Sequence, residues 1–290
     1  MARPAPATER TVAVLNFLAT RPDEAFTLSE LCRRLGLNKA TAHAMVAALT
    51  DAGYLLRHPA DRTYTLGPAL VAVGNAAAAR RFEVVDYARD EMRAVAEELD
   101  VQCVAAAALG DEMVMLATSG SASPFGAAVR VGDRVPLVPP LGTVYMAWSA
   151  PTDLESWLRR LGPTATEDEL EGYRAAVAAV RARGYSVALE PEARLRLARA
   201  LRDHDDVDAV VQDLGHEEYN LLELDRTTTY PVSVMTAPVF DADGHVALTL
   251  NLVGFRSPLR GADVPAVGER LRDAGLRVTR TIHGRVPDAA

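Results

Sequence analysis

Apolar residues recur at helical spacing in three segments near the start of the chain. Each segment repeats them three or four positions apart, which is the pattern of a helix that buries one face. The segments run from about Glu9 to Thr20, from Thr27 to Leu35 and from Asn38 to Leu49. The predicted inward positions are Val12, Leu15 and Leu18 in the first, Leu28, Leu31, Cys32 and Leu35 in the second, and Ala42, Met45, Val46 and Leu49 in the third.

The ends of the second and third helices are marked by capping residues. Thr27 and Glu30 have the spacing of a capping box, and Gly36 stands where a helix ends in the left-handed conformation. Asn38 is a favourable N-cap for the third helix. Because only Gly36, Leu37 and Asn38 join them, the two helices must pack at a steep angle, as in a helix-turn-helix.

Two β-rich runs follow the third helix and indicate a hairpin. Residues 54–58 and 63–66 flank Pro59-Ala60-Asp61-Arg62, which has the composition of a turn. A hairpin behind a recognition helix is the wing of a winged helix. We therefore predict a winged helix-turn-helix DNA-binding domain over residues 1–67.

The charge of the whole chain, −8, argues at first against nucleic acid as a partner. Residues 1–67, however, hold eight basic and six acidic residues, a charge of +2, so the rest of the chain carries −10. A mildly basic domain joined to an acidic one suits a DNA reader whose second domain stays off DNA.

Candidate DNA contacts lie along the third helix, on the outer side of the second and on the wing. Lys39, the one lysine of the chain, begins the third helix, where a phosphate is also favoured by the helix N-terminus. The alternative is a solvated charge beside a turn. The predicted phosphate contacts are Arg33, Arg34, Asn38, Lys39, Arg57 and Arg62, with Thr27 beside them, and the predicted base contacts are Ala40, Thr41, His43 and Ala44.

A second region, from Ala69 to about Leu99, contains few helix breakers. Ala88, Met92, Val95 and Leu99 share one face. The segment 68–99 is either a linker and dimerisation helix or a simple connector.

Strands and helices alternate over residues 100–290. Hairpins are predicted at 102–118, around Gly110-Asp111-Glu112, and at 231–255, around Asp241-Ala242-Asp243-Gly244. Helices are predicted over 142–150, 154–161, 166–183 and 265–283, with residues 136–140 extended. Neighbouring strands joined by hairpins predict an antiparallel sheet in an α+β fold.

The chain resembles the isocitrate lyase regulator (IclR) family of bacterial transcription factors over residues 10–290. The resemblance rests on short motifs in order, among them Leu31 to Thr41, Ala52-Gly53-Tyr54-Leu55, Tyr64-Thr65-Leu66-Gly67, Val131 to Leu137, Arg183-Gly184-Tyr185 and Ala237 to Gly244. It implies a winged helix, a linker helix and a GAF-like effector-binding domain with an antiparallel sheet. The family often has an arginine where this chain has Ala44, so one DNA contact differs and the operator sequence is not transferred.

The resemblance also implies a site for a small organic acid or aromatic compound. That site lies between the 231–255 hairpin and the start of the helix at Gly142, where backbone N–H groups favour a carboxylate. The positions carried over are Gly142, Thr143, Met146, Val234, Thr236, Thr249 and Asn251. The alternative is that Thr249 and Asn251 merely face solvent.

Other kinds of chemistry are not indicated. The two cysteines, Cys32 and Cys103, form no metal-spaced cluster, so we expect small core residues and no disulfide. The segment from Glu190 to Tyr230 is longer than usual for the family; its Asp203-His204-Asp205-Asp206 and His216 to Asn220 read as a solvated acidic loop rather than a metal site.

The sequence therefore predicts a ligand-responsive regulator with no cofactor and no metal. We expect a cytoplasmic protein without a signal peptide or membrane segment, which binds double-stranded operator DNA as a homodimer or homotetramer. The alternatives are an enzyme with an accessory winged helix, for which no nucleophile elbow or phosphate loop is found, and a constitutive architectural DNA binder.

Overall fold

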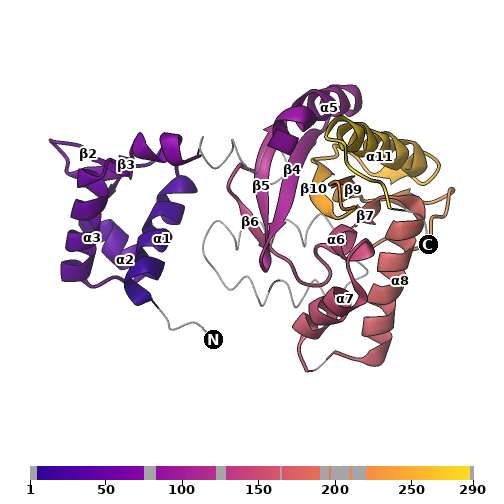
Figure 1. Ribbon diagram of the computed structural model, residues 1–290, viewed down its shortest axis with the longest axis horizontal. Coiled ribbons are helices and arrows are strands. Elements are labelled where there is room, and N and C mark those ends of the chain that lie inside the picture. The colour runs from indigo at the N-terminus through magenta and orange to yellow at the C-terminus, as the bar shows by residue number, and fades with distance from the viewer. Residues whose placement is uncertain are drawn as a thin grey trace. The chain divides into compact units, whose positions relative to one another are not determined.

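A computed structural model describes residues 5–74, 83–121, 129–163, 165–189, 196, 210 and 220–287. The chain divides into two compact units, residues 1–83 (unit 1) and 84–290 (unit 2) (Figure 1).

Unit 1 is a winged helix-turn-helix, as predicted. Its elements in chain order are α1 (Pro6–Ala19), β1 (Phe26–Thr27), α2 (Leu28–Leu35), α3 (Lys39–Asp51), β2 (Leu55–Arg57) and β3 (Thr63–Leu66), and residues 69–74 are again helical. The capping box of Thr27 and Glu30, the left-handed Gly36 and the Asn38 cap are all confirmed.

The core of unit 1 differs from the prediction at α1. Val12 is 49% exposed, whereas Val14, Phe17 and Leu18 are buried. Val14, Phe17 and Leu18 are three and four residues apart and therefore share one helix face, which is the buried one. The prediction that Val12 points inward was wrong. Phe17 packs edge-on against Phe26 at 4.9 Å between ring centroids, and this contact ties α1 to the small sheet.

The small sheet of unit 1 has three strands in the order β1-β3-β2. Strand β1 pairs Phe26 with Tyr64 and Thr27 with Thr63, and was not predicted. Because β1 runs directly into α2, this pairing fixes the start of the helix-turn-helix to the strands of the wing, defined as residues 55–66.

Unit 2 contains the predicted antiparallel sheet, with six strands in the order β6-β5-β4-β10-β9-β7 (Figure 1). The strands are β4 (Gln102–Leu109), β5 (Glu112–Ser119), β6 (Arg134–Pro136), β7 (Ser186–Ala188), β9 (Val234–Phe240) and β10 (Val246–Val253). The helices are α5 (Glu83–Leu99), α6 (Thr143–Ala147), α7 (Pro151–Leu158), α8 (Glu167–Arg183) and α11 (Val264–Thr281), with a 3-10 turn at Arg159–Leu161 and a separate ribbon of β8 (Thr229–Tyr230) and β11 (Leu259–Arg260).

Helices α5 and α11 lie side by side on one face of this sheet, the α11 face (Figure 1). Val85, Ala88, Met92 and Val95 of α5 are buried there. Arg277 of α11 donates to both carboxylate oxygens of Glu91, at 2.6 and 2.9 Å, and Arg270 donates to Glu98 at 2.7 Å. Helix α5 is therefore held within unit 2, and its role in linking or dimerisation stays a prediction.

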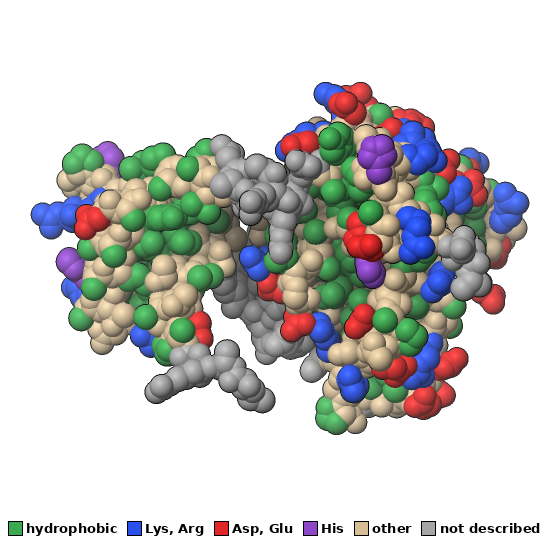
Figure 2. Space-filling view, in the orientation of Figure 1, with side chains coloured by type: hydrophobic (Ala, Val, Ile, Leu, Met, Phe, Trp, Pro, Cys, Tyr) green, Lys and Arg blue, Asp and Glu red, His purple; other side chains and the backbone are tan. Residues whose placement is uncertain are grey.

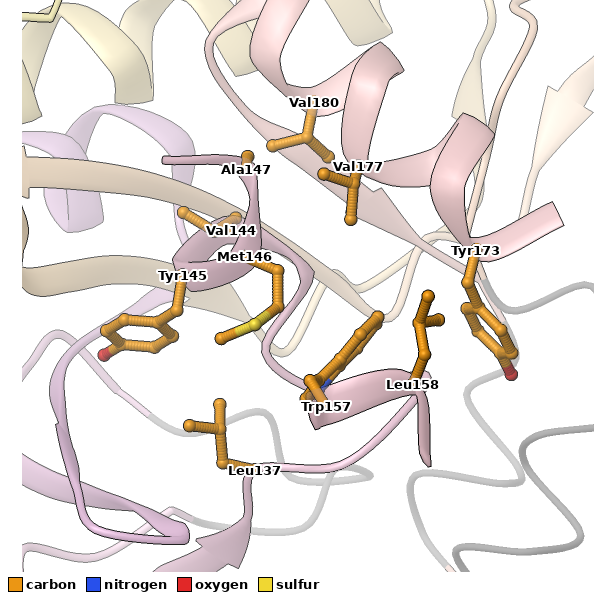
Figure 3. Packing of buried hydrophobic residues seen from close by; sticks show 10 residues of the cluster. All are labelled: Leu137, Val144, Tyr145, Met146, Ala147, Trp157, Leu158, Tyr173, Val177 and Val180. Carbon is orange, nitrogen blue, oxygen red and sulfur yellow. The ribbon is translucent and has the colours of Figure 1, made fainter. Parts of the chain in front are cut away.

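Helix α6 packs on the opposite face, the α6 face, and is shorter than predicted. It ends at Ala147 rather than continuing to Ala150. Pro151 opens α7 and forces Ala150 into an extended conformation, with φ −66° and ψ 151°, so the helix cannot run on. Side chains of α6, α7 and α8 form one apolar cluster around Trp157 (Figure 3).

In the part of the chain that the structure describes, no helix is long and apolar enough to cross a membrane.

Candidate functional site

The outward side of α3 is formed by small and polar side chains. Lys39, Ala40, Thr41, His43 and Ala44 are exposed, whereas Ala42 and Val46 of the same helix are buried at 1% exposure. Asn38 accepts a hydrogen bond from the backbone N–H of Ala40 at 2.9 Å, which fixes the first turn beneath Lys39. Because the exposed Ala40 and Ala44 carry only methyl groups, the helix backbone can approach a partner closely at these positions.

The two arginines of α2 are exposed on the same helix-turn-helix. The Arg34 guanidinium lies 5.8 Å from the centroid of the Phe26 ring, which orients its stem. Arg33 is exposed one residue before it. The hydroxyl of Thr27, in contrast, donates to Glu30 Oε2 at 2.8 Å and accepts from Glu30 N at 3.3 Å. The Thr27 side chain is therefore occupied in capping α2.

The wing carries three basic side chains near its tip. Arg57 lies 5.7 Å over the Tyr64 ring, and His58 contacts the Asp61 carboxylate through Nδ1. Arg62 has a left-handed backbone with φ 58°, and its side chain is exposed. Figure 2 shows blue and purple side chains over the side of unit 1 formed by α3 and the wing.

The second candidate site is on the α6 face of the sheet in unit 2. Asn251 is its hub: its amide Nδ2 donates to the carbonyls of Val104 (3.0 Å) and Thr249 (3.2 Å), and to Thr249 Oγ1 (3.1 Å). The Thr236 hydroxyl donates to Asn251 Oδ1 at 2.9 Å. Thr249 is 1% exposed, so the alternative that it faces solvent was wrong.

Helix α6 joins this cluster through Tyr145. Its hydroxyl donates to the Ala106 carbonyl at 2.8 Å and lies 3.3 Å from Thr249 Oγ1. Burial raises the pKa of Tyr145 far above its ordinary value, so the phenol stays protonated and acts as a donor. We call Tyr145, Thr236, Thr249 and Asn251 the polar cluster. Sequence reasoning missed Tyr145, because its role depends on how α6 meets the sheet.

Three further predicted ligand positions, Gly142, Thr143 and Met146, lie at or in helix α6. The Thr143 hydroxyl donates to Pro140 O at 2.9 Å and accepts from Asn220 Nδ2 at 3.4 Å. Gly142 has φ 84°, a backbone conformation that side-chain-bearing residues rarely adopt, and a Cβ there would also lie 2.2 Å from Leu137 Cδ1, so glycine is favoured. Met146 is buried in the apolar cluster drawn in Figure 3.

An apolar patch continues the same sheet face beside the polar cluster. Val104, Leu141, Ala188, Val234 and Val253 are buried together there. The polar cluster and this apolar patch together hold only aliphatic and uncharged polar side chains, a combination that suits a small ligand with an apolar body.

One group of described side chains has ligands close enough for a metal ion: Asp241, Asp243 and His245, in the β9–β10 turn. Asp241 Oδ1 already accepts hydrogen bonds from the backbone N–H groups of Asp243 and His245, at 3.0 and 2.9 Å. These bonds account for the turn without a metal. The acidic stretches at 203–206 and 216–219 lie outside the described residues.

Comparison with known proteins agrees with this arrangement. Residues 7–59 match the family model for the IclR helix-turn-helix domain. The HTH-type transcriptional regulator KipR of Bacillus subtilis (strain 168) is 25% identical over 273 residues, covering 94% of this chain and 95% of KipR.

Two solved structures share the fold. One is an IclR transcriptional regulator from Alicyclobacillus acidocaldarius, with a TM-score of 0.66 and 22% identity, covering 97% of this chain and 100% of that one. The other is an IclR homolog from Microbacterium hydrocarbonoxydans complexed with 4-hydroxybenzoate, with a TM-score of 0.65 and 19% identity, covering 96% and 99%.

Proposed function

Because the chain is a transcriptional regulator of the IclR type, we propose that it binds an inverted-repeat operator as a homodimer or homotetramer and responds to a small organic acid or aromatic metabolite. It acts in the cytoplasm, on double-stranded DNA.

The observation that carries the DNA part is the exposed side of α3. In this proposal Ala40, Thr41, His43 and Ala44 meet base edges in the major groove, where alanine methyl groups suit thymine methyls. Asn38 and Lys39 meet phosphate at the start of the helix.

The flanking phosphate contacts come from α2 and the wing. Arg33 and Arg34 meet the backbone on one side of the groove, and Arg57 and Arg62 meet it on the other. Because residues 1–67 carry a net charge of only +2, two copies acting on two half-sites supply the affinity. Thr27 supports α2 from its capping position.

The effector in this proposal lies on the α6 face of unit 2. The polar cluster and Thr143 orient it, and Val234 with the neighbouring apolar patch covers its body. A relative that binds 4-hydroxybenzoate supports an aromatic acid as one such compound. Helix α6 has five residues, so its dipole is weak, and we assign orientation of the ligand to hydroxyl and amide groups rather than to the helix start.

Coupling between the two units is thermodynamic. If the effector changes DNA affinity by some factor, DNA must change effector affinity by the same factor. Helix α5 is the element through which this coupling passes, because its ion pairs with Arg270 and Arg277 attach it to unit 2 and its chain leads back to unit 1.

A mobility-shift assay on the DNA flanking the gene tests the proposal. We expect binding that weakens steeply with salt. Lys39→Ala removes one proposed phosphate contact from each of two half-sites and should therefore reduce the slope of log K against log salt by about 1.8. Arg256→Ala is the matched control, because Arg256 is an exposed cation of unit 2 paired with Asp100. Equal slopes for the wild type and Lys39→Ala would reject the phosphate contact.

The same assay is repeated with a panel of small carboxylates and aromatic acids. A compound that alters the shift at constant salt supports the effector part. A shift indifferent to every compound would leave DNA binding standing and count against the ligand site, and the absence of any shift would reject the regulator mechanism proposed here.

A further inference from the structure

Three buried polar side-chain atoms of unit 2 have no hydrogen-bond partner among the described residues. Two are guanidinium nitrogens, of Arg181 and Arg270, whose groups bond through another nitrogen to Ala147 O and Glu98. The third lies on the sheet. It is Oε1 of Gln102, whose side chain is 6% exposed. Its amide Nε2 points at the Val129 carbonyl at 3.5 Å, a long and weak hydrogen bond. An amide flip that exchanged Oε1 and Nε2 would place Oε1 against the Val129 carbonyl oxygen, which is also an acceptor. Oε1 therefore lacks a donor in either orientation of the amide.

The register of the sheet locates Gln102 beside the candidate ligand site. Gln102 pairs with Val253 across β4 and β10, and Val104, two residues on, pairs with Asn251. Side chains two apart on a strand point to the same face, so Gln102 shares the α6 face with Val104 and the polar cluster. Val253 and Val104 belong to the apolar patch, and Val129 packs against it.

An unpaired acceptor in such surroundings is unfavourable in the empty protein. Leaving a buried polar atom without a hydrogen bond costs roughly as much free energy as losing a hydrogen bond. A buried acceptor that the protein itself does not pair is therefore suited to a donor on a bound molecule. The other polar groups of this face, by contrast, bond to one another: Asn251 uses both its oxygen and its nitrogen, and Tyr145 donates to Ala106.

We propose that Gln102 is a specificity residue of the effector site and that its Oε1 accepts a hydrogen bond from the effector. The effector is then a small molecule that carries a donor, a hydroxyl or an N–H, on the part that reaches the β4 end of the apolar patch. This inference rests on the proposed ligand site in unit 2 and adds the chemical group that the site selects.

The first experiment needs no ligand. The melting temperature of full-length Gln102→Leu is compared with that of the wild type, since leucine has a similar length and no polar atom. We expect the variant to melt at the same or a higher temperature, because it removes an unsatisfied acceptor and adds apolar burial. A clearly lower melting temperature would mean that the amide is already satisfied in the empty protein, and would overturn the proposal.

The second experiment uses two matched pairs of probes, 4-hydroxybenzoate against benzoate and lactate against propionate. Binding is measured by calorimetry on the full chain. In at least one pair the donor-bearing member should bind the wild type about tenfold or more tightly, and Gln102→Leu should remove that preference. Asn16→Leu, an exposed change on α1 of unit 1, is the control and should keep it.

The outcomes separate this inference from the proposed function. Equal binding within each pair, or a preference that survives in Gln102→Leu, overturns the role of Gln102 while leaving a ligand site in place. If none of the four probes binds the wild type, both the donor group and the ligand class proposed for the site are rejected, and the mobility-shift assay judges DNA binding independently.

Discussion

Two glycines in the middle of helices are predicted to respond oppositely to alanine. Gly275 of α11 lies against the sheet: a Cβ there would stand 2.4 Å from the backbone oxygen of Pro238 in β9. Gly172 of α8 is exposed, and a Cβ there would meet nothing within 4 Å. Alanine favours a helix over glycine by about 1 kcal/mol at both positions, so the difference isolates the contact.

The contact at Gly275 outweighs that gain. The helix or the strand must move by several tenths of an ångström, and overpacking of this kind costs about 1–3 kcal/mol. The shift also strains the hydrogen bonds of Thr279, which accepts from Phe240 N at 3.0 Å and donates to Gly275 O at 2.8 Å, at a further cost of about 1 kcal/mol. We expect Gly275→Ala to lose about 1–3 kcal/mol net and Gly172→Ala to gain about 1 kcal/mol.

Urea unfolding followed by tryptophan fluorescence measures both changes. The two tryptophans, Trp148 and Trp157, belong to unit 2, so the signal reports the unit that contains both glycines. A Gly275→Ala midpoint at or above that of the wild type would refute the close packing of α11 on β9. A loss of stability in Gly172→Ala would refute the assumption that alanine gains the same helix preference over glycine at both positions.

Three further predictions follow from the buried and capping groups. Burial raises the pKa of Cys103 to about 12, so a thiol reagent at pH 8 should modify at most Cys32 in the folded protein and both cysteines after unfolding; two fast modifications would contradict this. Hydrogen bonds from Thr27 lower the pKa of Glu30 below its ordinary 4.5, so its contribution is present above that pH and lost as pH falls further; acid unfolding of unit 1 should be less pH-dependent in Glu30→Gln. Trp157→Phe leaves the Leu141 carbonyl without its 3.0 Å donor and should lower stability by about 1–3 kcal/mol in a denaturant titration, and no loss would exclude that bond.

The sequence predicted those parts of the fold whose chemistry is local. The start of α2 depends on Thr27 and Glu30, three residues apart, and its end depends on Gly36. The hairpins were found for the same reason, because each turn lies between the two strands it joins. The antiparallel pairings of β4 with β5 and of β9 with β10 follow from these hairpins, whereas the pairing of β4 with β10 that joins them was not predicted.

Features that depend on distant contacts were missed. Strand β1 is two residues long and is defined by its pairing with β3, more than 35 positions along the chain. Tyr145 and Gln102 gain their roles from the residues that β4 and β10 bring beside them. The positions carried over by resemblance fared unevenly: Thr236, Thr249 and Asn251 are hydrogen-bonded together, whereas Met146 packs in the core.

The two outermost strands of the large sheet bear on how copies of the protein can associate. Both β6 and β7 are three residues long, and β6 ends in Pro136, which has no N–H to offer a further strand. Beyond β7, Ala188 forms a bridge with Asn220, and Leu221 N donates to Val187 O at 2.9 Å. Two short edge strands, one ending in proline and the other partly covered, resist the addition of a strand from another molecule, which protects against aggregation. Self-association of unit 2 is therefore expected to use helix and loop surfaces, with no strand pairing between the sheets of two copies.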